Sequence, residues 1–143
     1  MNKKIVMGLL IIFTLMMGIS SVNAGLFDFM SESPSSDLNV SNIEIVDKGY
    51  YMYDVNCEIT PKKDFNYLEM YVIFYDSDNA VIEKSSLVWN INSPTKDQLI
   101  KVNGNAFMTN QNANPARAEV FITDSVGDNK PEDAIFAQNV TMS

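Results

Sequence analysis

The residue types that most often carry enzyme chemistry are scarce in this chain. It contains no histidine, which excludes Ser-His-Asp and Cys-His nucleophilic sites and the usual zinc sites that depend on histidine. The only cysteine, Cys57, has no base beside it in the sequence, and no glycine-rich phosphate loop is present. Asp76 and Asp78 form a carboxylate pair, but they lie in a predicted tight turn rather than in a cleft suited to acid–base work. We therefore expect that the protein is not an enzyme.

Side-chain oxygens gather in two short runs that raise the question of calcium. Asp76, Asp78 and Asn79 offer oxygens within four residues, and a second acidic run lies at residues 124–133. Calcium takes about six to eight oxygen ligands, and neither run has the glycine and glutamate spacing of the known calcium loop. Turn formation explains the first run and a solvated acidic loop explains the second. Calcium at the first run is the lesser alternative, and we expect no bound metal and no cofactor.

A row of tyrosines is the most interesting candidate for ligand contact. Tyr67, Tyr71 and Tyr75 recur at every fourth residue of one predicted strand, so their side chains point to the same side of a sheet. Such a row could stack on sugar rings or form a protein interface, because tyrosine offers a large contact area at low entropic cost. The alternative is that both faces of this strand are buried and that the rings cover their own sheet.

The lone cysteine has two possible roles in an exported protein. Apolar residues at odd positions from 51 to 59 alternate with mostly polar residues at even positions, which places Cys57 on the apolar face of a strand. We expect it to be a small buried hydrophobic residue. Pairing with a cysteine of another chain is the alternative.

Two asparagines stand in sequons for N-linked glycosylation. Asn39 begins Asn-Val-Ser and Asn139 begins Asn-Val-Thr. In an exported chain both are possible glycosylation sites if the host has the machinery. Short sequons also arise by chance in a chain this rich in asparagine.

The first 24 residues have the three parts of an export signal. Lys3 and Lys4 precede an apolar run at residues 5–19, which is shorter than the roughly 20 residues that span a bilayer. The run is followed by Val22-Asn23-Ala24, a fitting cleavage site, and an uncleaved anchor is the alternative. Cleavage would leave eight basic and 18 acidic residues. We expect a secreted protein at the cell exterior that binds neither nucleic acid nor, once the signal is removed, a membrane.

The remainder of the chain predicts one all-β domain at residues 38–143, preceded by an entry segment at residues 25–37 that is first apolar and then rich in serine. Short segments with alternating or two-sided apolar patterns are separated by turn residues, and no helical periodicity competes. This pattern predicts an immunoglobulin-like sandwich of two antiparallel sheets with seven to eight strands. The expected strands are 38–46, 50–60, 65–75, 80–91, 98–102, 105–109, 117–123 and 134–142, with Asn103-Gly104 as a turn.

One stretch of sequence, YVIFYDSDNAVI at residues 71–82, resembles the FxLYD family of small immunoglobulin-like domains in exported prokaryotic proteins. Phe74, Tyr75 and Asp76 hold places of the family pattern. Val72 replaces its aromatic residue, and Asn79 stands where the turn glycine would be. The resemblance covers roughly residues 38–124. It implies a β-sandwich module at the cell exterior, usually without a defined activity, and it transfers no catalytic residues.

Two functions are compatible with these features. The first is an exported, non-catalytic binding or adhesion module that recognises a protein or glycan at the cell exterior, through Tyr67, Tyr71 and Tyr75. The second is a structural component of the cell envelope or an assembly accessory, which would associate with itself or with a partner through residues 26–30 or a free sheet edge.

Overall fold

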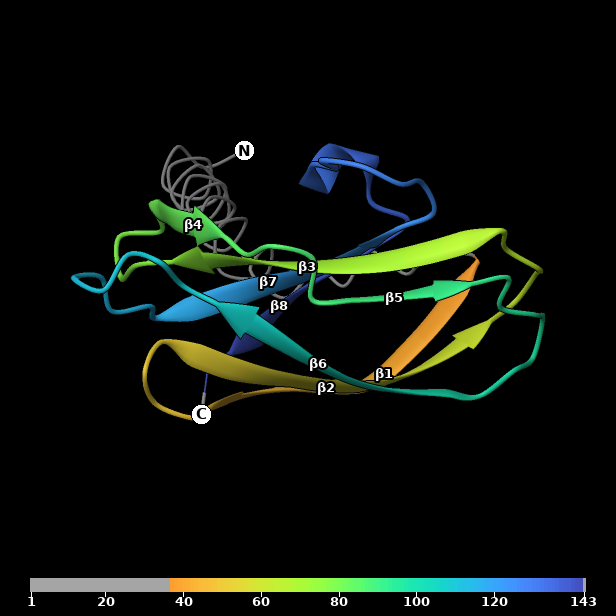
Figure 1. Cartoon of the computed structure of the whole chain (residues 1–143), viewed down its shortest axis with the longest axis horizontal. Coiled ribbons are helices and arrows are strands. Elements are labelled where there is room, and N and C mark those ends of the chain that lie inside the picture. Colours follow the sequence, from red (N-terminus) through yellow and green to blue (C-terminus); the bar gives the residue numbers. More distant parts are fainter. Residues whose placement is uncertain (1–36, 143) are drawn as a thin grey trace, which may run out of the picture. The chain divides into compact units, whose positions relative to one another are not determined.

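Two antiparallel β-sheets make up the part of the chain that the structure describes. The structure is a computed structural model and describes residues 37–142 (Figure 1). The predicted signal peptide at 1–24 and the entry segment up to residue 36 lie outside the described residues. The predicted all-β class with seven to eight strands is confirmed. The strands are β1 (Leu38–Asp47), β2 (Met52–Pro61), β3 (Tyr67–Tyr75), β4 (Val81–Lys84), β5 (Trp89–Asn92), β6 (Ile100–Phe107), β7 (Arg117–Thr123) and β8 (Phe136–Thr141).

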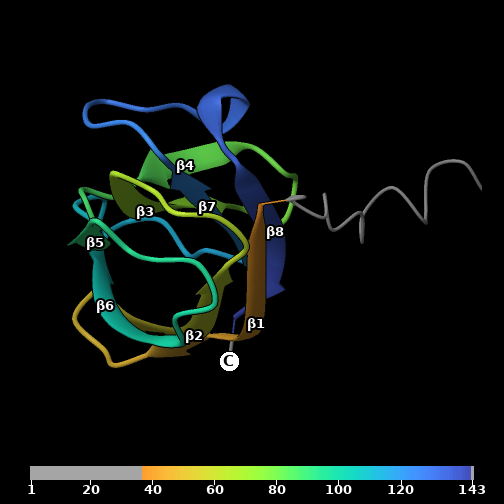
Figure 2. The same ribbon diagram turned by 90° about the vertical axis from the view of Figure 1, so that its right-hand side faces the viewer.

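The two sheets stack face to face as a sandwich. One sheet has the order β1-β2-β6, and the other has the order β4-β3-β7-β8, with β5 also paired to β3. Seen from its end, the sandwich has β1 beside β8 at one side and β6 beside β5 at the other (Figure 2). Strands β1, β2 and β6 thus oppose β3, β7 and β8, which is the strand order of immunoglobulin-like sandwiches.

The main core lies between the sheets and follows the alternation in the sequence. In β2 and β6 every second residue is buried, so these strands have one apolar face and one outward face. The inward residues include Val55, Cys57 and Ile59 of β2, Leu68, Met70, Val72 and Phe74 of β3, Val102 of β6, and Ala118, Val120 and Ile122 of β7.

β3 is the central strand of its sheet, as its two apolar faces predicted. It pairs with β4 and β5 along one edge and with β7 along the other. Its second face carries a smaller apolar cluster of Tyr71, Ile73 and Phe121, against which Ala134 and Ala137 pack. Among residues 37–142 no helix is long and apolar enough to cross a membrane; η2 (Pro131–Asp133) is a single short 3-10 turn.

The predicted single strand at residues 80–91 was wrong, because the chain breaks between β4 and β5. Ser85 lies at the break and is buried. Its backbone N–H donates to Val72 O, and its Oγ accepts the N–H of Val72 at 3.0 Å. The Ser85 hydroxyl thus accepts the Val72 N–H in place of a backbone carbonyl of a neighbouring strand. The chain can therefore leave the regular strand path while the Val72 N–H stays hydrogen-bonded.

The predicted turn at Asn103-Gly104 was also wrong, because both residues lie within the continuous strand β6. Asn103 pairs with Asn56 and Gly104 pairs with Val55 of β2. A Cβ atom on Gly104 would lie 2.7 Å from Val88 Cγ1 and 2.8 Å from the Val88 carbonyl oxygen. The glycine is therefore needed where the segment between β4 and β5 passes close to β6, rather than for a turn.

Candidate functional site

The predicted tyrosine row lies on the outer face of the β4-β3-β7-β8 sheet, but it is not an open platform. Tyr71 is only 7% exposed, and Tyr67 and Tyr75 are half-buried. Residues 124–135, the segment between β7 and β8, lie against this face: the Tyr71 hydroxyl donates to Gly127 O at 2.6 Å, and Ala134 packs on the same cluster. We call residues 124–135 the covering segment.

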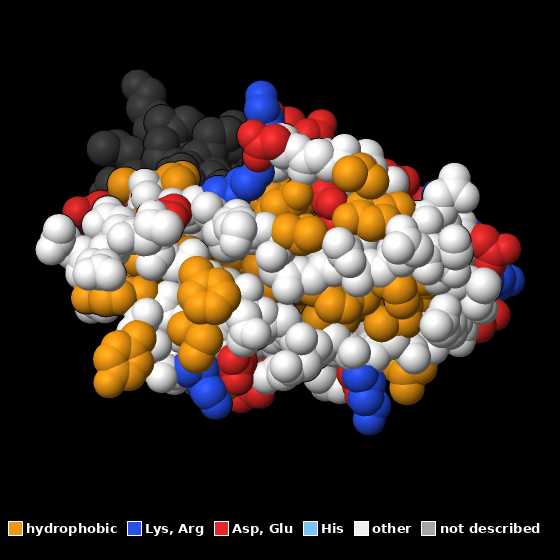
Figure 3. All heavy atoms as spheres, in the orientation of Figure 1, with side chains coloured by type: hydrophobic (Ala, Val, Ile, Leu, Met, Phe, Trp, Pro, Cys, Tyr) orange, Lys and Arg blue, Asp and Glu red, His pale blue; other side chains and the backbone are white. Residues whose placement is uncertain are grey.

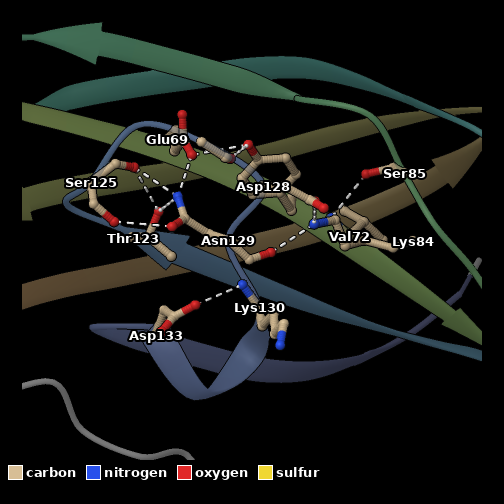
Figure 4. Close-up of polar contacts among 12 residues, drawn as sticks. Glu69, Val72, Lys84, Ser85, Thr123, Ser125, Asp128, Asn129, Lys130 and Asp133 are labelled. Carbon is tan, nitrogen blue, oxygen red and sulfur yellow. Dashed lines mark hydrogen bonds and ion pairs between the residues drawn. The ribbon is translucent and has the colours of Figure 1, made fainter.

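A buried polar network holds the covering segment to the sheet (Figure 4). Its centre is the carboxylate of Glu69, which is 1% exposed and lies next to the tyrosines on β3. Glu69 accepts a hydrogen bond from the Tyr67 hydroxyl at 2.8 Å, and its Oε1 lies 2.9 Å from the Tyr71 hydroxyl, whose one hydrogen is shared between Glu69 and Gly127 O. From the covering segment, Asn129 donates its amide to Glu69 and, at 2.9 Å, to Thr123 Oγ1. Within residues 37–142 every buried side-chain nitrogen and oxygen has a partner.

The tyrosine hydroxyls of this network are protonated and act as donors. Burial, followed by the hydrogen bond to Glu69, raises the pKa of Tyr71 to about 12. Burial and the hydrogen bond to Glu119, at 2.7 Å, raise the pKa of Tyr75 to about 12, although Arg117 opposes the shift. The hydroxyls are therefore committed to internal acceptors over the whole physiological pH range.

Two cations occupy ring faces that a sugar would need for stacking. Lys84 Nζ lies 4.7 Å from the centre of the Tyr71 ring and donates to Asp128 Oδ1 at 2.5 Å. The Arg117 guanidinium lies 3.6 Å from the centre of the Tyr75 ring. Whether the row contacts a ligand stays a prediction, but its geometry is that of a structural assembly that seals one face of the sheet.

The candidate calcium residues form a turn. The Asp76 side chain accepts the backbone N–H groups of Asp78 at 2.9 Å and Ala80 at 2.8 Å. Asn79 has a left-handed backbone, with φ of 62°, and its side-chain oxygen accepts the Arg117 Nε–H at 2.9 Å. In the described part of the chain no group of three or more acidic, cysteine or histidine side chains is placed to hold a metal.

The prediction for Cys57 is confirmed, since its side chain is 4% exposed and faces the core from β2. Burial, with a smaller contribution from Glu58, raises the pKa of the thiol to about 12. A neutral, buried thiol is a poor nucleophile, and it cannot reach a cysteine of another chain without unfolding of the strand.

The two sequons are exposed. Asn39 lies on β1, and Asn139 lies on β8, where its side-chain oxygen accepts a hydrogen bond from Arg117 Nη1 at 2.6 Å. Exposure is required for a glycosylated asparagine, and the modification itself stays a prediction.

Sequence reasoning missed an exposed aromatic surface at the β1–β2 turn. Gly49, Tyr50 and Tyr51 all have left-handed φ, at 79°, 55° and 61°. The Tyr50 side chain is 98% exposed, and Phe107 at the end of β6 is 49% exposed. Figure 3 shows hydrophobic side chains at the surface at lower left, where Figure 1 places this turn and the end of β6. The available signal was the pair of tyrosines directly after a turn glycine.

We call Tyr50, Met52 and Phe107 the hairpin-end surface. Met52 and Phe107 face each other across the β2–β6 pair. Left-handed backbone costs a bulky residue about 1–2 kcal/mol, and here two adjacent tyrosines adopt it. That conformation is held by Met108, whose N–H donates to Tyr51 O at 3.0 Å, and by Met52, whose N–H donates to Gly49 O.

Comparison with known proteins finds solved structures of low similarity, among them three that each have a TM-score below 0.5. No family model and no curated protein matches the chain. The alkylpurine DNA glycosylase AlkC of Pseudomonas fluorescens, solved with DNA containing an abasic site analog, is 10% identical at a TM-score of 0.49, over 74% of this chain and 30% of that one. A DUF1425 family member from Shewanella sp. pv-4 is 19% identical at a TM-score of 0.42, over 64% and 81% of the two chains. DesR, a β-glucosidase from Streptomyces venezuelae solved with D-glucose, is 15% identical at a TM-score of 0.40, over 74% and 15%.

Proposed function

We propose that this domain is an exported, non-catalytic binding module that recognises a protein or glycan at the cell exterior. The observation that carries the proposal is the hairpin-end surface, where Tyr50 is 98% exposed on a left-handed backbone. Large exposed aromatic side chains oppose solubility and add nothing to a core, whereas they are the side chains that binding surfaces use most. A strained turn that presents such a side chain is a feature typical of recognition.

The chemistry of the chain supports contact rather than catalysis. The sequence has no histidine, and the only thiol is buried with its pKa raised to about 12. The buried carboxylate of Glu69 is surrounded by internal hydrogen-bond donors that belong to the covering segment and to β3. The polar groups with unusual environments are thus used to hold the fold together.

The proposal is tested by binding to the envelope of the cells that produce the protein. The full chain is expressed in an exporting host, and the purified product is sedimented with washed envelope over a range of concentrations. We expect saturable binding that is weakened at least about tenfold by Tyr50→Ser, as for a central aromatic contact. Val126→Ser is the matched control, because Val126 is 78% exposed but lies in the covering segment.

Two outcomes contradict this function. One is the absence of saturable binding, and the other is equal binding by wild type, Tyr50→Ser and Val126→Ser. Thermal unfolding of each variant shows whether the fold is retained. A loss of binding with an unchanged melting temperature supports the proposal.

Self-association is the second candidate, and the outer edge of β8 favours it. β8 pairs with β7 on one side and, among residues 37–142, has no strand hydrogen-bonded to its other edge, which lies beside β1. An unpaired edge strand can add a strand from a second copy. Sedimentation velocity from low to high micromolar concentration separates the two candidates, since self-association gives a mass that rises with concentration.

A further inference from the structure

The outward face of the β1-β2-β6 sheet carries a regular array of amide and carboxylate side chains. Asp54, Asn56 and Glu58 alternate with buried residues along β2, and Asn103 and Asn105 alternate with buried residues along β6. We call Asp54, Asn56, Asn103 and Asn105 the amide face. Asn103 and Asn105 are exposed, and in Figures 1 and 2 no strand of residues 37–142 lies beyond β2 and β6 on this side.

Cross-strand hydrogen bonds hold these side chains in fixed positions. Asn103 lies opposite Asn56 and donates its Nδ2 to Asn56 Oδ1 at 2.6 Å. Asn105 lies opposite Asp54 and donates its Nδ2 to Asp54 Oδ1 at 2.7 Å. The two rows are two residues apart along the strands, which is roughly 7 Å. Because the rotamers are held before binding, a ligand would find these groups already ordered.

The Asn56–Asn103 pair presents an unused donor and an unused acceptor to solvent. An asparagine has two N–H donors and an oxygen with two lone pairs. In the Asn56–Asn103 pair, Asn56 Nδ2 and Asn103 Oδ1 have no hydrogen-bond partner within the residues that the structure describes. A sugar hydroxyl is a donor and an acceptor at once, so it can bond to both members of such a pair.

The charge of this face fits a neutral ligand. Lys48 lies 3.3 Å from Asp54, and Lys101 lies 3.9 Å from Glu58, so the two carboxylates of β2 are locally balanced. The chain as a whole has a formal net charge of −8, which disfavours anionic polymers at any of its surfaces. A cationic ligand would gain little on a face whose carboxylates already have cationic partners.

An aromatic ring ends the array. Phe107 lies next to Asn105 on the same face of β6, across from Met52, and is 49% exposed. Its ring can stack on the C–H face of a sugar, while the side-chain pairs of the amide face bond to hydroxyl groups. One ligand would thus make apolar contacts with Phe107 and polar contacts with the amide face.

We propose that the amide face and Phe107 bind a neutral glycan chain. The Asn56–Asn103 and Asp54–Asn105 pairs bond to its hydroxyls, and Phe107 stacks on a ring at one end. The inference rests on the proposed binding function and names the class of ligand and the surface that receives it.

The test uses the washed envelope as the probe, after either protease digestion or periodate oxidation, which cleaves vicinal diols of sugars. Binding of the wild-type full chain should survive the protease and be lost after periodate. The double variant Asn56→Ala/Asn103→Ala should bind the protease-treated envelope at least about tenfold more weakly, since it lacks two ordered hydrogen-bonding groups. Asn92→Ala is the matched control, an exposed strand asparagine in the other sheet.

The outcomes separate this inference from the function on which it rests. Binding that is lost on protease digestion and resists periodate identifies a protein ligand, which overturns the glycan inference and keeps the binding function. Periodate-sensitive binding that is unchanged in the double variant overturns the amide face as the site. Absence of binding to untreated envelope overturns both. Melting temperatures of both variants confirm that the fold is retained.

Discussion

The two outer faces of the sandwich use similar side chains for different purposes. On the β3–β7 face, Glu69, Asn129 and Tyr71 are buried together and bond to one another. On the β2–β6 face, Asp54 and Asn105 bond across the strands but stay in contact with solvent. The difference is the covering segment, which lies on the first face and has no counterpart on the second among the described residues. Carboxylates, amides and aromatic rings are therefore structural on one face and available on the other.

The largest expected difference is in the free energy of unfolding when a phenylalanine is replaced on one outer face or on the other. Phe121 is fully buried on the covered face and stacks on Tyr71 with ring centres 5.4 Å apart. Phe121→Ala should lower the free energy of unfolding by about 3–5 kcal/mol, because it leaves a cavity. Phe107→Ala on the open face should cost less than about 1 kcal/mol. Urea denaturation measures both, and equal costs would show that the covered face is not a packed layer.

A second contrast concerns the polar groups of the two faces. Glu69→Ala removes an acceptor shared by Tyr67, Tyr71 and Asn129, although Tyr71 keeps Gly127 O and Asn129 keeps Thr123 Oγ1. We expect a loss of about 1–3 kcal/mol in urea denaturation, because the buried network is weakened, together with faster limited proteolysis within the covering segment. Asn103→Ala should change stability by less than about 0.5 kcal/mol. If the two variants unfold at the same urea concentration, the network does not hold the segment.

A third contrast is a pH dependence to which the covered face contributes through Tyr71 and Tyr75. Tyr71 and Tyr75 have a folded-state pKa of about 12, above the value of about 10 for an unfolded tyrosine. Folding therefore favours the protonated hydroxyls, and this stabilisation is complete below about pH 10 and is lost as pH rises towards about 12. The urea midpoint should fall over that range, and the fall should be smaller in Tyr71→Phe. A midpoint that does not change above about pH 10 would contradict the environment described for these rings.

Local patterns in the sequence predicted the strands well where one residue in two is buried. The alternation around Cys57 placed it in the core, and the shared face of Ala118, Val120 and Ile122 is the inward face of β7. The prediction of a turn at Asn103-Gly104 was wrong. It relied on the pair being a strong local turn signal. Here the glycine is needed because Val88 packs too close to leave room for a side chain, and no local sequence pattern reveals that contact.

The candidate surfaces were predictable only in part. The spacing of Tyr67, Tyr71 and Tyr75 correctly placed three side chains on one side of β3, and the alternative that the rings cover their own sheet was weighed. Their environment depends on the covering segment, which reaches Tyr71 from 56 residues away through Gly127. Contacts over such a separation leave no periodic trace in the sequence.

The sequence by itself determined the class of fold, because burial of every second side chain depends only on the two-residue period of a strand. It also determined that histidine chemistry is absent and that Asp76 begins a turn. Only the tertiary structure decided which polar and aromatic side chains are sealed and which are open. The physical reason is that solvent exposure depends on which distant segment packs on each face. The local sequence of the covering segment does not specify the face on which it packs.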